Sequence, residues 1–159
     1  MDSSNLSESQ SVTFSIWGAP RGKGRPRMTR SGHTYTDART RAYETAVKVE
    51  ATAAMRGRRP FAKGCVVLLE AIFEPPKSLS RKKRTALLGT PVMKKPDIDN
   101  VEKSVIDGMN GTIFYDDSQV WATFGVKRYG ETNRVDVKVV ECETLNELAE
   151  SEGLNDYQN

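Results

Sequence analysis

The alternation of apolar and polar residues along the chain predicts short strands separated by helices. Residues 12–17 alternate apolar side chains with Thr and Ser, as a half-buried strand does. Residues 65–73 form a dense apolar and β-branched run, which predicts a central strand. Two further runs, 119–127 and 134–142, flank a glycine-containing turn, so we expect them to pair as a closing hairpin.

Three segments between these runs are predicted to be helices, two of them from the apolar spacing of an amphipathic helix and the short middle one from its cap and stop signals. The first is capped by Asp37 or Thr36 and is expected to run to about Met55. A short basic helix is expected over 81–88, and a third helix over 98–109. The order of these elements predicts a single α+β domain, with a mixed sheet of about four strands and helices packed on one face.

This domain is expected to span residues 12–142, between two tails. Residues 1–11 are polar and are expected to be disordered. Residues 143–159 belong to an acidic segment for which we expect a short helix followed by a disordered end. A solubilising role is the favoured interpretation of this tail, and packing against a basic surface in imitation of DNA is the alternative.

The composition excludes several classes of protein. A chain of 159 residues suffices for one domain with its own core, although a dimer could supply part of it. No apolar stretch approaches the roughly 18 residues of a membrane span, and the N-terminus is polar, so we expect a cytoplasmic protein without a membrane or organic cofactor as partner. Cys65 and Cys142 lie in apolar runs without metal-ligand spacing, so both are expected to be buried free thiols.

The net charge of +3 conceals a strong segregation of charge. Residues 21–59 hold eleven Lys or Arg against three acids, and residues 77–95 hold seven against none. Such runs suit a polyanion such as DNA, and the alternative is an ordinary solvated surface. The expected DNA contacts are Arg21, Lys23, Arg25, Arg27, Arg30, Arg81, Lys82, Lys83, Arg84, Lys94 and Lys95.

Four aspartates interrupt this basic chain in two pairs. Asp97 and Asp99 stand at the start of the third helix, and Asp116 and Asp117 precede the strand that follows it. If the start of the strand lies beside the start of the helix, these carboxylates converge, and their mutual repulsion requires a cation. Mg²⁺ is the natural occupant, and Mn²⁺ can substitute for it. The alternative is that the first pair merely caps a helix and the second makes a surface turn.

The acidic helix also carries a stripe of alternating charge. Asp99, Lys103 and Asp107 follow one another at intervals of four residues and therefore share one face. Asp107 is expected to lie about 12 Å along the helix from Asp99 at roughly 1.5 Å per residue, so we interpret it as a supporting residue or as the partner of Lys103.

These motifs together resemble the RusA family of Holliday junction resolvases. The match is carried by Lys95-Pro-Asp-Ile-Asp-Asn-Val-Glu-Lys103 and by the Asp-Asp-x-x-Val spacing from Asp116 to Val120. It extends more loosely to the N-terminal third. The resemblance implies that Asp97, Asp99 and Asp117 hold catalytic magnesium, that Asp116 is a less certain ligand, and that Lys103 is an essential basic residue. It also implies a homodimer with two active centres that nick a four-way DNA junction symmetrically, in recombination and repair within a bacterial or phage-infected cell.

Three other functions stay open at this point. The same centre would serve a nuclease for flaps, forks or other branched DNA, and a non-catalytic module could bind junctions with structural carboxylates. An RNA-binding domain is the third, but no aromatic-rich sheet motif supports it, and we expect Trp17 and Trp121 in the core.

Overall fold

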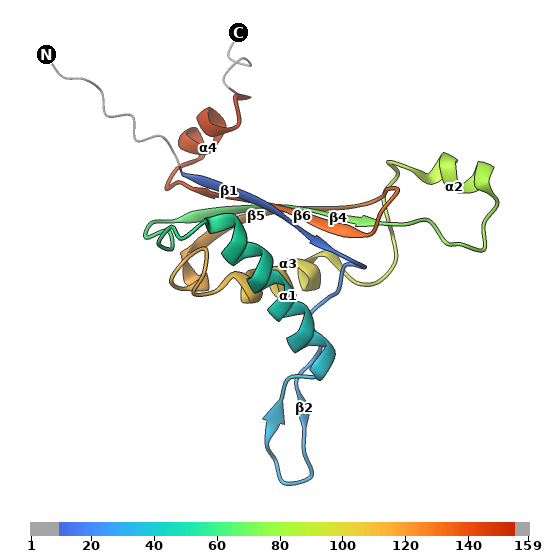
Figure 1. Cartoon of the computed structure of the whole chain (residues 1–159), viewed down its shortest axis with the longest axis horizontal. Helices are drawn as coiled ribbons and strands as arrows, with labels where there is room; N and C mark the ends of the chain where they lie inside the picture. The colour runs from blue at the N-terminus through green and yellow to red at the C-terminus, as the bar shows by residue number, and fades with distance from the viewer. Residues whose placement is uncertain (1–9, 155–159) are drawn as a thin grey trace, which may run out of the picture.

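The fold is a mixed four-stranded sheet with two long helices against one face, as the computed structural model of residues 10–154 shows (Figure 1). The strands are β1 (Ser11–Trp17), β4 (Cys65–Phe73), β5 (Val120–Tyr129) and β6 (Arg134–Glu141). Their order is β1-β6-β4-β5, with β5 parallel to β4 and the other pairs antiparallel. The predicted α+β class and mixed sheet are confirmed. The disorder expected at the chain ends falls largely on residues 1–9 and 155–159, outside the described part.

The predicted hairpin between the last two strands is wrong, because β4 lies between them. Seven of the nine residues of β4 are buried, so this strand needs a neighbour on each edge. The four residues between β5 and β6 instead cross the end of β4, where Gly130 donates its N–H to the Phe73 carbonyl at 2.9 Å. A side chain at Gly130 would collide with Ile72, so the crossing depends on glycine.

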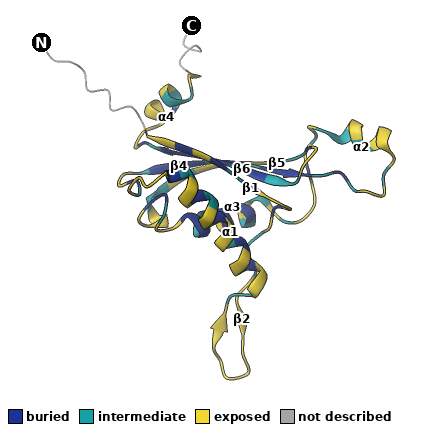
Figure 2. Cartoon of the chain, in the orientation of Figure 1, coloured by how far each residue is buried: buried dark blue, intermediate teal, exposed yellow. Residues whose placement is uncertain are grey.

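The main core lies between the sheet and the helices α1 (Ala38–Met55) and α3 (Ile98–Met109). The bounds of both helices agree with the prediction, and Asp37 is the N-cap of α1. A smaller cluster on the opposite face joins Leu148 of α4 (Leu145–Ser151) to Val66 and Val140 (Figure 2). The long helices thus cover one face as predicted, and the short C-terminal helix packs on the other. None of the helices in the described part is long and apolar enough to cross a membrane.

Close packing of α1 on α3 depends on Gly108, and replacing it with alanine is expected to destabilise the fold. A Cβ at this position would lie 2.6 Å from Val47 Cβ and 3.0 Å from the Glu44 carbonyl oxygen. We expect Gly108→Ala to lower the free energy of unfolding by about 1–3 kcal/mol, measured by urea denaturation. The loss should shrink in a Val47→Gly background, which removes the Cβ atom that the new methyl group would meet, and an equal loss in both backgrounds would contradict this explanation.

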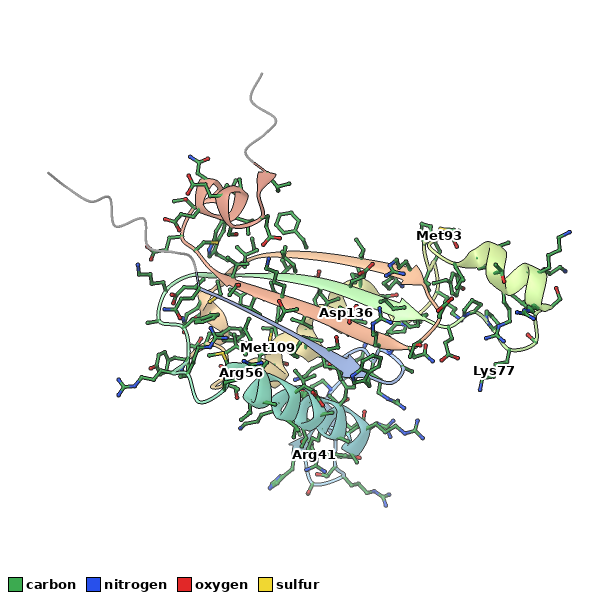
Figure 3. All side chains as sticks on the ribbon, turned by 45° about the horizontal axis from the view of Figure 1, so that its top comes forward. Arg41, Arg56, Lys77, Met93, Met109 and Asp136 are labelled. Carbon is green, nitrogen blue, oxygen red and sulfur yellow. The ribbon has the colours of Figure 1, made fainter. Side chains whose placement is uncertain are left out.

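Two basic segments project from this body (Figure 1). One carries α2 (Arg81–Leu87), the predicted short helix, of which no residue is buried. Lys77 and Met93 flank this segment, and Met93 is 93% exposed (Figure 3). The other is an antiparallel ribbon of β2 (Arg27–Met28) and β3 (Thr34–Tyr35), which the sequence pattern did not predict.

The two tryptophans of the chain are exposed, whereas its two cysteines are buried. Trp17 and Trp121 were predicted in the core, but the structure corrects this, since they are 64% and 42% exposed. Trp121 is the extra residue in an irregularity of the β4–β5 pairing, and its indole N–H donates to the Cys142 carbonyl at 2.7 Å. Cys65 and Cys142 are buried free thiols, as predicted.

Candidate functional site

The start of α3 carries an aspartate that does not serve as a helix cap. Asp97 occupies the N-cap position of α3, yet its side chain accepts no capping hydrogen bond. By contrast, the N-cap side chains of α1, α2 and α4 each accept a backbone N–H. The Asp97 carboxylate is half exposed and forms an ion pair with the Lys95 ammonium at 3.2 Å. The alternative that Asp97 merely caps a helix therefore loses its support.

Asp99 has a carboxylate neighbour that the sequence analysis missed. Glu102 lies one turn along α3 and packs against β5, where a side chain at Gly125 would collide with it. Burial raises the pKa of Glu102; the hydrogen bond from the Thr123 hydroxyl lowers it, and the charge of Asp99 raises it. The spacing of three residues from Asp99 was the signal that could have found it. One end of α3 thus presents three acids.

The loop that leads into Asp97 is fixed by β5 and by the N-terminal segment. Lys127 of β5 donates to the carbonyls of Lys94 and Pro96 at 2.6 and 2.8 Å. From the other side, Lys23 donates its backbone N–H to the Asn100 carbonyl at 3.0 Å, and Gly22 packs on Pro96. The approach to the acids is therefore held between two distant parts of the chain.

Lys103 is placed by an ionic network on the same face of α3. The Lys23 ammonium binds Glu44 at 2.8 Å and also binds Asp107, whose other oxygen lies 3.8 Å from the Lys103 ammonium. Burial lowers the pKa of Lys23, but its hydrogen bonds with Asp107 and Glu44 outweigh this and raise it overall. The side chain of Lys103 is 63% exposed. Lys103 is thus available to a ligand, whereas Lys23 is neutralised within the protein.

The two aspartates of the second pair, Asp116 and Asp117, have different surroundings. Asp116 caps the short 3-10 helix over Asp117–Gln119, and it accepts the Ser118 N–H at 2.8 Å in a reciprocal capping box with Gln119. The hydrogen bonds with Ser118 lower the pKa of Asp116. Asp117 is exposed and starts the segment that leads into β5. Asp116 is therefore engaged in local structure, while Asp117 faces solvent.

The two pairs of aspartates lie at opposite ends of α3 within one chain. The helix has twelve residues and is therefore about 18 Å long. Its N-terminal end lies beside Gly125, whereas Asn110, just after its last turn, bridges to Phe114 in the loop that leads to Asp117. The expectation that the strand starts beside the helix start is wrong, because β5 starts beside the helix end. Within residues 10–154, no three His, Cys, Asp or Glu side chains are grouped so that they could hold a metal ion.

Comparison with known proteins decides the family. The family model described as endodeoxyribonuclease RusA matches residues 18–140. The chain belongs to the RusA family. A curated relative from Bacillus subtilis (strain 168), named "Uncharacterized protein YqaN", is 34% identical over 139 residues, which cover 82% of this chain and 96% of that protein.

The RusA match includes both aspartate pairs, Lys103 and both basic projections. The site residues predicted from the sequence therefore lie within the segment that defines an endodeoxyribonuclease family. Of the expected DNA contacts, Arg25, Arg27 and Arg30 belong to the ribbon, and Lys94 and Lys95 lie in the loop before Asp97. The remaining ones are Arg21 beside the ribbon, the internally paired Lys23, and Arg81, Lys82, Lys83 and Arg84 of α2.

Proposed function

We propose that this RusA-family chain is a magnesium-dependent endonuclease that resolves four-way DNA junctions by paired nicks. The observation that carries the proposal is the exposed end of α3. There, Asp97 forgoes its capping role beside Asp99, and an exposed Lys103 follows one turn later. Basic residues lie in the loop directly before α3, at Lys94 and Lys95, and both projections of the chain are basic as well. Such a combination suits a phosphodiester substrate.

The donor chemistry fits Mg²⁺, but one chain supplies only part of the set. Carboxylate oxygens are the ligands that this ion prefers. Asp97 and Asp99 would hold it at one end of α3, and Asp117 is the further ligand expected from the family. Because Asp117 lies at the other end of α3, we infer that Asp117 of a second copy of the chain completes the set. Asp116 is the poorer candidate, since it already caps the 3-10 helix.

The residues of the chain divide the work of hydrolysis. When bound, Mg²⁺ supplies a Lewis acid that stabilises negative charge on the phosphate oxygens. Lys103 contacts the scissile phosphate and stabilises the additional charge of the transition state. Asp107 holds the ammonium of Lys103 over the face of α3, and Lys23 anchors Asp107. Lys23 thus acts through this network in place of the DNA contact that was expected from the sequence.

A two-fold dimer accounts for both the incomplete site and the substrate. A four-way junction offers two symmetry-related strands, and a C₂ dimer offers two equivalent centres. Nicks made by the two centres would be symmetric and ligatable. A nuclease for flaps or forks would use the same residues on other branched DNA. In a non-catalytic binding module, the carboxylates would have no part in hydrolysis.

Cleavage of a labelled junction separates these functions. We expect the full-length protein with Mg²⁺ to nick two opposing strands of a four-way junction symmetrically, and to lose this activity in EDTA. Linear duplex, flap and fork substrates of the same sequence serve as controls. Faster cleavage of flaps or forks would assign the protein to that substrate class. Tight junction binding without any nick, at every metal tested, would favour the binding module.

A further inference from the structure

The ribbon of β2 and β3 is an arm without a core on either side. Every residue from Arg25 to Tyr35 is exposed, and Figure 1 shows the ribbon extending beyond the start of α1, away from the sheet. An isolated two-stranded ribbon is marginally stable, and it gains nothing here from burial. Its strands pair Arg27 with Tyr35 and Met28 with Thr34, so large side chains stand on both of its faces. A segment built in this way is suited to binding an external partner.

The two legs of the arm are clasped where they meet the body. Gly24 on one leg donates its N–H to the Thr40 hydroxyl at 3.1 Å, and that hydroxyl donates to the Asp37 carboxylate at 3.0 Å. A Cβ at Gly24 would lie 2.7 Å from both side-chain oxygens, so only glycine permits this approach. The clasp directs the arm outward from the first turn of α1. The turn at the tip is also closed, since Thr29 and His33 exchange hydrogen bonds.

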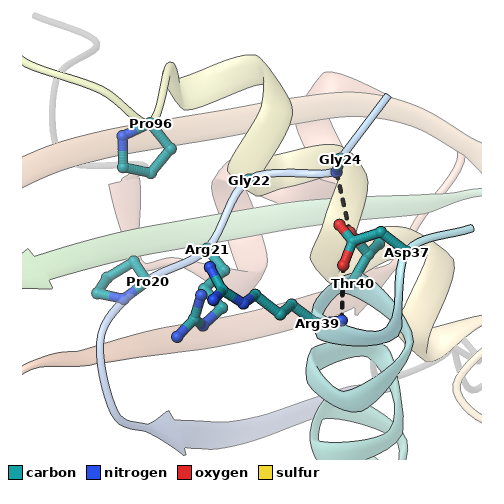
Figure 4. Close-up of a pocket in the computed structure, with 8 residues that line it drawn as sticks. All are labelled: Pro20, Arg21, Gly22, Gly24, Asp37, Arg39, Thr40 and Pro96. Carbon is teal, nitrogen blue, oxygen red and sulfur yellow. Dashed lines mark hydrogen bonds between the residues drawn. The ribbon is translucent and has the colours of Figure 1, made fainter. Parts of the chain in front are cut away.

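A hollow at the base of the arm brings together two arginines from different elements. Its lining includes Arg21, from the segment that follows β1, and Arg39, from the first turn of α1 (Figure 4). Arg39 was not among the contacts expected from the sequence. An adjoining hollow is lined by Asp97 and Lys95, and the two hollows share Gly22 and Pro96. An anion held by the arginines would therefore lie next to the acidic centre.

The charge of the arm selects the chemistry of its partner. Residues 18–36 contain no acid, and the arm itself carries Arg25, Arg27 and Arg30. Two strands about 4.8 Å apart, with their side chains, fit the major groove of B-DNA, which is about 12 Å wide. The minor groove, at about 6 Å, is too narrow for them. From Gly24 to the tip the arm spans roughly 25 Å, which corresponds to about seven base pairs.

We propose that the β2–β3 arm enters the major groove of one duplex arm of the junction while Arg21 and Arg39 bind a backbone phosphate at its base. The inference rests on the proposed function only in naming a junction, since any duplex beside the acidic centre would be bound in the same way. The clasp at Gly24 and Thr40 sets the direction of the duplex, and the shared wall at Gly22 and Pro96 leads its backbone towards Asp97.

Binding measurements in EDTA test the arm independently of cleavage. One variant replaces 26–35 with a short Gly-Ser linker, a second replaces Arg25, Arg27 and Arg30 with Gln, and a third combines Arg21→Gln with Arg39→Gln. For linear duplex we expect about 10- to 100-fold weaker binding in the first two variants. The slope of log K against log salt should fall by about 2.7 in the second variant, if each of its three arginines loses a phosphate contact, and by about 0.9 in the third, where the two arginines share one phosphate. Arg56→Asn, which removes a positive charge at the far end of α1 (Figure 3), is the matched control.

The footprint identifies the groove. Wild-type protein should protect guanine N7, a major-groove atom, from dimethyl sulfate over about seven base pairs, and the linker variant should lose this protection while its thermal melting is unchanged. Unchanged affinity and salt slope in all three variants would overturn the inference, as would a footprint without N7 protection. Loss of duplex binding in the arm variants would support DNA binding by the arm even if the wild type cleaves no junction. Failure of this inference can therefore be distinguished from failure of the proposed function. An arm that binds an acidic protein instead would leave DNA binding unaltered.

Discussion

Replacing Asp99 with asparagine is expected to lower the rate of junction cleavage roughly 1000-fold, which corresponds to about 4 kcal/mol of transition-state stabilisation. The change removes one carboxylate charge from the proposed metal site and leaves the shape of the side chain almost unaltered. Junction binding should be retained or become slightly tighter, because a negative charge next to the phosphates is lost. The variant therefore separates the catalytic use of this carboxylate from any use in binding.

The fold should tolerate this change. Asp99 is exposed in the first turn of α3, where an acid contributes only about 0.5 kcal/mol through the helix dipole. The buried side of α3, with Val101 and Val105, is untouched. Removal of the Asp99 charge should also lower the pKa of Glu102, because that charge is one of the causes that raise it. The thermal melting temperature is thus expected to remain close to that of the wild type.

The measurement is single-turnover cleavage of a labelled junction, with binding followed separately in EDTA. Glu150→Gln, an exposed acid on α4 at the other face of the sheet, is the matched loss of one charge. It should cleave like the wild type. A cleavage rate of Asp99→Asn within a few fold of the wild type would remove Asp99 from the catalytic centre, and equal losses in both variants would indicate an effect of net charge.

The amphipathic elements of this chain could be predicted from the sequence because the residue pattern that defines each of them lies within the element itself. The apolar positions of α3 recur at helical spacing, and glycines follow its end, so its bounds agree with the prediction. The buried run of β4 was recognisable for the same reason. The neighbours of β4 were not, because strand order depends on which strand most needs two covered edges. Proximity in the chain favoured a β5–β6 hairpin, and burial of β4 prevented it.

The candidate site was predictable in its chemistry but not in its assembly. The spacing of Asp99, Lys103 and Asp107 on one helix fixes their common face wherever the helix packs. The position of Asp117 depends on the direction in which β5 runs past α3, which no local pattern contains. Lys23 was expected on the surface because it belongs to a basic run, yet tertiary structure pairs it with Glu44 and Asp107.

Mixing Asp99→Asn with Asp117→Asn is expected to restore cleavage that neither variant has alone. If the acids at the start of one α3 work with Asp117 of a second copy, the mixed dimer contains one centre with both substitutions and one centre with none. Two different affinity tags allow this heterodimer to be purified after co-expression. It should nick junctions at about half the rate of the wild-type dimer, and it should release singly nicked junctions in place of resolved duplexes.

The pattern of recovery distinguishes a shared centre from one assembled within a single chain. If α3 and the Asp117 loop of the same chain closed around the metal, both centres of the heterodimer would carry one substitution and remain inactive. A heterodimer of Asp97→Asn with Asp99→Asn is the control, because these residues share one end of α3 and cannot complement each other in either arrangement. Recovery in the first heterodimer and none in the second would place Asp117 opposite the partner's helix. No recovery in a verified heterodimer would indicate that the centre is completed within one chain, so that β5 or the loop before it must move by much of the length of α3. Such a displacement should be detectable as a metal-dependent change in hydrogen exchange over residues 110–120.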